Sequence, residues 1–133
     1  MDAALLWIHI LAAIVGFIIS GVVAGWTLKQ TSPEALPLSF WRWQRVAQWI
    51  TVVLGAAGTA LYLTGKRPTD PLHLLYGALA LLAIVLLGAF GRDRDPREFL
   101  QGWKVNPKWI LFALNVFLWA MYGRGLTTGF FGV

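Results

Sequence analysis

The chain has 133 residues, of which 58% are hydrophobic and only 13% charged, and its mean hydropathy is +0.65. This charged share is about half that of an average soluble domain, which points to a lipid environment. There is no cysteine, which excludes disulfides, thiolate-held iron–sulfur clusters and covalently attached haem. The net charge of +5 comes from basic residues in short gaps between apolar runs, which argues against nucleic-acid binding.

Four apolar segments are each long enough to cross a bilayer, because a span takes roughly 20 helical residues at about 1.5 Å each. The sequence predicts helices at about 3–28, 40–64, 71–90 and 107–124. The first begins with Met1 and Asp2, without a basic residue, and is longer than the apolar core of a signal peptide, so we expect it to be retained. The chain is therefore expected to be all-α, a single four-transmembrane-helix bundle over residues 1–133.

Polar residues followed by proline mark the predicted helix starts. Asp70-Pro71 and Asn106-Pro107 each offer a capping side chain and then a proline at the first helical position, where its missing N–H costs no hydrogen bond. Asp95-Pro96 opens the segment PREFLQ, residues 96 to 101. We expect this segment to form a short interfacial helix in the third loop, along the membrane surface.

Lysine and arginine are distributed unequally between the two sides of the predicted bundle. Eight fall in the first and third loops and three on the other side. Cytoplasmic loops are enriched in these residues, so both termini and the second loop are expected outside, in an integral multi-pass protein of a bacterial or archaeal plasma membrane. The eight are Lys29, Arg42, Arg45, Arg92, Arg94, Arg97, Lys104 and Lys108, and the three are Lys66, Arg67 and Arg124.

The chain contains only two histidines, His9 and His73. Each lies near the start of a predicted helix, and the two helices run in the same direction, so the histidines sit at comparable depths of roughly 9 and 3 Å. Each also heads a helical ridge of small residues, which includes Gly16 after His9 and Gly77 after His73. Such ridges allow close helix packing, or they leave room for a flat macrocycle, and both interpretations stay open.

A haem b held by the two imidazoles would explain this pairing. Lys66 and Arg67 are then expected to pair with the haem propionates, and Tyr76 to donate to a propionate or pack on the ring edge.

A plainer interpretation exists for each of these residues, namely snorkelling histidines, ordinary flanking charges and an interfacial tyrosine. Asp70 is most simply a helix cap, although it also lies close enough to orient a ring N–H of His73.

Other polar residues carry weaker signals. No acidic or basic side chain lies in the central third of a predicted helix, which argues against a proton pump, a voltage sensor or an ion-coupled transporter. Asn115 and Thr51 are expected to join helices by hydrogen bonds. Arg45 and Gln48 suggest either a quinone-headgroup site or a snorkelling surface. The segment GVVAG, residues 21 to 25, matches GxxxG and indicates close packing or a homo-oligomer.

The segment WIHILAAIVG, residues 7 to 16, places a histidine before small residues in the first helix. In this and in its topology the chain resembles small four-helix b-type membrane cytochromes and the related copper-resistance and protoporphyrinogen-oxidase-like membrane proteins. The resemblance covers about ten residues of one helix and implies a haem protein. Those cytochromes usually carry more histidines, so for this chain it implies at most one haem.

The first functional expectation is a membrane protein with one bis-histidine haem near the outer face, acting in electron transfer or quinone redox chemistry. Its partners would be the lipid bilayer and a quinone or a redox protein. A second is a non-catalytic subunit or homo-oligomer that packs against a respiratory or photosynthetic complex, with structural or pigment-binding histidines. A third is a membrane enzyme of porphyrin metabolism. Whether the protein is an enzyme stays open at this point.

Overall fold

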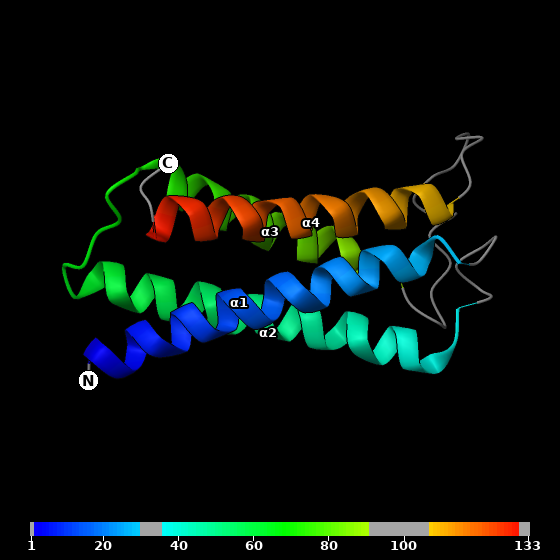
Figure 1. The fold of residues 1–133 in the computed structure, drawn as a ribbon, viewed down its shortest axis with the longest axis horizontal. Helices are drawn as coiled ribbons and strands as arrows, with labels where there is room; N and C mark the ends of the chain where they lie inside the picture. The colour runs from blue at the N-terminus through cyan, green and yellow to red at the C-terminus, as the bar shows by residue number, and fades with distance from the viewer. Residues whose placement is uncertain (1, 30–35, 91–106, 131–133) are drawn as a thin grey trace.

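The computed structural model describes residues 2–29, 36–90 and 107–130 (Figure 1). These ranges contain four helices and no strand, which confirms the predicted all-α fold. The helices are α1 (Asp2–Thr27), α2 (Leu38–Leu63), α3 (Leu72–Leu87) and α4 (Pro107–Phe130). Consecutive helices run in opposite directions, so the start of α1, the end of α4 and the α2–α3 connection meet at one end (Figure 1). This end carries both histidines and is called the histidine end below.

Two helix ends differ from the predicted ones. Helix α3 stops at Leu87, before the predicted end at residue 90, where Gly88 and Ala89 form a turn through bonds to Ile84 and Leu86. Helix α4 continues to Phe130 instead of ending at Arg124. Its polar residues do not break the helix because the Thr127 and Thr128 hydroxyls donate back to the Arg124 carbonyl. The predicted interfacial helix at 96–101 lies outside the described residues.

Helices α1, α2 and α4 are long and apolar enough to cross a membrane, and α3 with its 16 residues is shorter. At 1.5 Å per residue α3 spans about 24 Å, against about 30 Å of hydrocarbon. Large apolar side chains are exposed on every helix, among them Leu11, Val22, Trp49, Val85 and Trp109. An exposed apolar surface of this kind suits contact with lipid tails and is consistent with an integral membrane protein.

Asp70 caps the start of α3. Its carboxylate accepts a hydrogen bond from the Leu72 amide at 2.9 Å, and its carbonyl accepts one from the His73 amide at 3.1 Å. Pro71 already has helical dihedral angles, and the regular helix begins one residue later, at Leu72. The cap predicted at Asp70 is therefore present.

The other end of α3 is bonded to α2 by two side chains. Gln48 donates from Nε2 to the Ile84 carbonyl at 3.0 Å, and Arg45 donates from Nη2 to the Phe90 carbonyl at 2.9 Å. Arg45 also donates to the Gln48 side-chain oxygen at 2.6 Å. The Ile84 carbonyl also accepts from the Gly88 amide, so Gln48 gives it a second bond, whereas Phe90 lies beyond the helix, where an unpaired carbonyl in lipid is costly. Arg45 and Gln48 therefore act as inter-helix bonds that hold the short helix in place.

The bundle core lies where side chains from all four helices meet, and Val23, Phe40, Leu87 and Leu118 are fully buried there. Helix α1 packs against α2 and α4, and α3 packs mainly against α4. The weakest of these contacts is between α2 and α3. Helices α1 and α3 consequently lie on one diagonal of the bundle and α2 and α4 on the other.

Two glycines of α1 provide a matched test of this packing. A Cβ added at Gly16 would overlap the Tyr122 ring, whereas one added at Gly25 meets nothing within 4 Å. We expect Gly16→Ala to lower the free energy of unfolding by about 1–3 kcal/mol, because a packed ring must move. Gly25→Ala should leave it unchanged or raise it by up to about 1 kcal/mol through helix propensity. Thermal unfolding followed by circular dichroism in detergent measures both, and equal effects would contradict the packing described.

Candidate functional site

The histidine end contains a cavity of about 710 Å³, lined by all four helices and the α2–α3 connection. Cofactor and ligand pockets usually measure roughly 300 to 1,000 Å³, so the volume suits a small organic molecule. Most of the lining is apolar, with Leu6, Ile10, Leu54, Leu81 and Met121 among the wall residues. Six of the seven residues predicted for the site line the cavity, namely His9, Lys66, Arg67, His73, Tyr76 and Gly77.

The two imidazoles meet across the α1–α3 diagonal. Their ring centroids are 5.9 Å apart and the ring planes are inclined at 65°. Imidazole nitrogens bind metal ions at about 2.0–2.1 Å, so two rings on opposite sides of one ion have centroids roughly 6 Å apart. The spacing between His9 and His73 is thus one that a single metal centre spans.

The hydrogen bond of His9 determines which of its nitrogens is available. Nδ1 lies 3.1 Å from the Leu54 carbonyl oxygen on α2. A carbonyl only accepts, so in the neutral ring Nδ1 carries the proton and Nε2 keeps its lone pair. Gly58, one turn after Leu54, makes room for this position, because a Cβ there would come within 2.9 Å of the His9 Cε1 atom.

His73 is held in the same way by α4. Its Nδ1 lies 3.1 Å from the Thr128 hydroxyl oxygen. Thr128 donates its own hydrogen to the Arg124 carbonyl at 2.7 Å, so its oxygen accepts from His73. Nε2 of His73 therefore also keeps its lone pair. The alternative in which Asp70 orients this ring is wrong, because Asp70 is engaged at the start of α3 and Thr128 bonds the ring.

The donor set suits haem better than a bare ion. Within residues 2–29, 36–90 and 107–130 no three His, Asp or Glu side chains gather to hold a metal. Two imidazoles leave a bare ion short of the four ligands that zinc takes. A porphyrin brings four nitrogens of its own and asks the protein only for axial ligands. The chemistry of two neutral imidazoles and an apolar wall is therefore compatible with a haem, whose four nitrogens would complete the ligand set.

The mouth of the cavity is basic and aromatic. Lys66 and Arg67 line it from the α2–α3 connection, and the Arg67 guanidinium lies over the Tyr62 ring at 3.9 Å from its centroid. Stacking of this kind orients a guanidinium while its N–H groups stay available to an anion. The rim can thus bind carboxylates on an occupant of the cavity.

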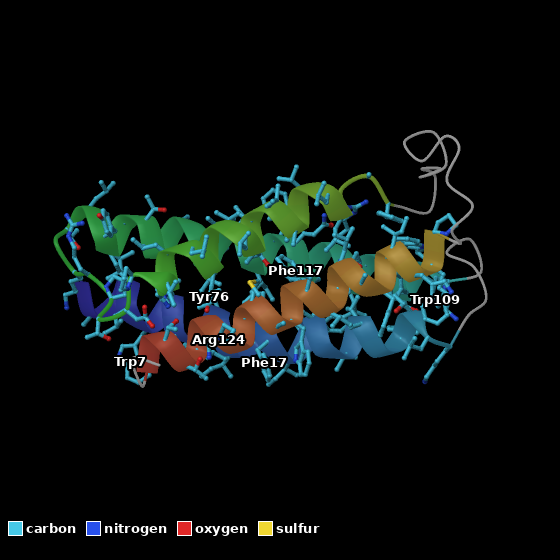
Figure 2. All side chains as sticks on the ribbon, turned by 90° about the horizontal axis from the view of Figure 1, so that it is seen from above. Trp7, Phe17, Tyr76, Trp109, Phe117 and Arg124 are labelled. Atoms are coloured by element: carbon cyan, nitrogen blue, oxygen red, sulfur yellow. The ribbon has the colours of Figure 1, made fainter. Side chains whose placement is uncertain are left out.

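Arg124 of α4 is not itself a lining residue, but it places a further cation against Tyr76, which lines the cavity. Its guanidinium lies 5.2 Å from the Tyr76 ring centroid, and Nη2 donates to the Tyr76 hydroxyl at 3.4 Å. Figure 2 shows Tyr76 and Arg124 side by side near the histidine end. The rim therefore carries two arginine–tyrosine pairs, Arg67 with Tyr62 and Arg124 with Tyr76.

The predicted small residues lie in two different surroundings. Gly77 lines the cavity, and a Cβ there would meet nothing within 4 Å. Gly16 is not among the lining residues and lies buried against the Tyr122 ring. Tyr122 in turn donates to or accepts from Thr51 at 2.7 Å, and both residues line the deep end of the cavity. Gly16 therefore affects the cavity indirectly, because it leaves room for the Tyr122 ring that lines it.

A comparison of the chain with models of known protein families, with curated proteins and with solved structures finds no match. The resemblance to b-type membrane cytochromes consequently stays an expectation.

The ring nitrogens provide a direct test of the site. We expect nitrogen NMR of histidine-labelled protein at pH 8 to show both rings with Nδ1 protonated and Nε2 bare, because Leu54 and Thr128 accept from Nδ1. Thr128→Val should return His73 alone to the commoner tautomer with Nε2 protonated. Thr127→Val is the control, since its hydroxyl bonds only the Arg124 carbonyl. Protonated Nε2 on both rings of the wild-type protein would contradict the site.

Proposed function

We propose that the protein is a membrane haem b protein with His9 and His73 as the axial ligands of one haem, working in electron transfer or quinone redox chemistry. One observation carries the proposal: two imidazoles lie 5.9 Å apart, and each has its Nδ1 bonded to a residue of another helix, which leaves Nε2 without the proton in the neutral ring. Metal-binding histidines typically donate their second nitrogen to a carbonyl or another oxygen. The apolar walls and the basic rim add support.

Different residues of the cavity would hold the ligands, exclude water and bind the propionates. Leu54 and Thr128 hold the rings and make them better ligands, because a hydrogen bond from Nδ1 raises the basicity of Nε2. The apolar wall excludes water, and the arginines of the rim pair with propionates. When bound, the haem iron supplies one-electron redox chemistry. With both axial positions taken by histidine, we favour an electron carrier over an oxygenase.

The same proposal includes the membrane topology. All four helices lie in the bilayer, with the short α3 held within it by Arg45 and Gln48, and the histidine end faces the outside of a bacterial or archaeal plasma membrane. The sequence has eight lysines and arginines in the predicted first and third loops against three on the other side, and this difference supports the orientation. The haem then lies near the outer face, where a quinone in the bilayer or an external redox protein can reach it.

The interpretation as an enzyme of porphyrin metabolism uses the same cavity, which is large enough for a macrocycle as substrate. The two hypotheses differ in what happens to the macrocycle, since a carrier retains it unchanged and an enzyme releases a product. The interpretation as a non-catalytic subunit needs no cofactor.

Spectroscopy of the purified membrane protein tests the ligand pair. We expect a Soret band and a reducible low-spin spectrum, because two imidazole ligands give a strong axial field. His9→Ala and His73→Ala should each remove the low-spin spectrum. Thr59→Val is the matched control, since Thr59 lines the cavity but its hydroxyl bonds only its own helix at Gly55.

A colourless protein that takes up no haem on reconstitution would contradict the proposal and favour the subunit. A protein that alters an added porphyrin and releases it would favour the enzyme.

The basic rim makes a separate prediction. We expect Arg67→Gln and Arg124→Gln each to weaken haem binding about two- to fivefold, the range of one partly exposed ion pair. Both variants should bind haem dimethyl ester, which has no propionate charges, as well as the wild-type protein does. Arg42→Gln, at the opposite end of the bundle, is the control. Equal loss for haem and its ester would show that the arginines do not act through propionates.

A further inference from the structure

A row of buried polar side chains, called the polar seam, lies between α2 and α4. It extends from the wall of the cavity away from the histidine end. Gln44 and Thr51 are seven residues apart on α2, and Asn115 and Tyr122 are seven apart on α4, so each pair occupies one face of its helix. All four residues are at most 3% exposed. The Asn115 Nδ2 group donates to the Gln44 Oε1 atom at 2.9 Å, and the Thr51 and Tyr122 hydroxyls are 2.7 Å apart. Two polar contacts thus cross the core, about 10 Å apart along the bundle.

In the described part of the chain, three buried side-chain polar atoms lack a hydrogen-bonding partner, and two of them belong to this seam. The three are Trp41 Nε1, Gln44 Nε2 and Asn115 Oδ1. Gln44 and Asn115 are fully buried, and Trp41 lies one helical turn before Gln44 on α2. Buried polar groups are nearly always bonded, so the two unpaired atoms on the bonded amides of Gln44 and Asn115 need an explanation.

The orphan atoms are chemically complementary. Gln44 Nε2 is a donor and Asn115 Oδ1 an acceptor, on two amides that already share one hydrogen bond. The other hydrogens of Asn115 are used, since Nδ2 also donates to the Leu111 carbonyl at 3.1 Å. A water molecule accepts one hydrogen bond and donates others, so a single water satisfies both atoms. An apolar ligand satisfies neither.

We infer that Gln44 and Asn115 form a buried water-binding site within the apolar core, in which a water accepts from Gln44 Nε2 and donates to Asn115 Oδ1. The site lies two helical turns below the Thr51–Tyr122 contact that ends the cavity, and toward the end of the bundle where α2 begins. The bound water brings a proton-exchanging group between two fully buried amide side chains. This inference goes beyond the proposed function and does not require a haem.

Proton NMR of nitrogen-labelled protein in lipid nanodiscs tests the site through magnetisation transfer from water to the side-chain amide of Gln44. We expect a direct water contact at Gln44 Nε2 in the wild-type protein, both without and with added haem. Asn115→Leu should abolish the contact, because it removes the acceptor and fills the space. Asn115→Ser should keep it, because serine leaves room and a hydroxyl.

No water contact at Gln44 in the folded wild-type protein would overturn the inference, and this measurement decides the matter even where Asn115→Leu fails to fold. A contact that persists in folded Asn115→Leu would also overturn it, since the water would then not depend on Asn115. A protein that binds no haem would contradict the proposed function but not this water site. The absence of water at Gln44 would contradict the water site but not the proposed function.

Discussion

The site depends on hydrogen bonds that hold two imidazoles by Nδ1 from helices other than their own. Histidine side chains near a membrane surface are free to turn toward lipid headgroups. Here His9 is bonded to the Leu54 carbonyl of α2 and His73 to the Thr128 hydroxyl of α4. Both acceptors belong to the α2–α4 diagonal, and the histidines come from the α1–α3 diagonal. Every helix therefore contributes to the relative position of the two rings, and the assembled bundle is needed to bring the imidazoles within 5.9 Å of each other.

The remaining polar contacts explain why the bundle stays together around a cavity. In lipid the hydrophobic effect does not drive helices together, so packing and inter-helix hydrogen bonds must do so. The cavity removes packing at the histidine end, where α2 and α3 would otherwise meet. Arg45 and Gln48 bond α2 to the other end of α3, and the Gln44–Asn115 pair bonds α2 to α4. Cross-helix bonds below the cavity thus compensate for contacts that the cavity excludes.

Much of this arrangement was predictable from the sequence, and the missing parts share one physical cause. Helix type and number follow from apolar runs, and the common depth of His9 and His73 follows from their distance to a helix start. Which residue meets each ring depends on the rotation and crossing of neighbouring helices, which no single-helix pattern encodes. Leu54 bonds His9 through its backbone carbonyl, which every residue has, so the type of its side chain gives no indication of this role. Thr128 and Arg124 were missed because polar residues at 124–128 indicated a helix end, whereas the threonine hydroxyls bond within a continuing helix.

The charge distribution around the cavity argues for an occupant that is itself amphiphilic. A purely apolar molecule would gain nothing from Lys66, Arg67 and Arg124, and a small anion would gain nothing from walls of leucine, isoleucine and methionine. A bare metal ion would use the two imidazoles but neither the volume nor the rim. The proposed haem is flat and apolar, binds two axial nitrogens and carries two carboxylates on one edge, so it would use the whole set. The deep end of the cavity, closed by Thr51 and Tyr122, then separates the occupant from the buried amides beneath it.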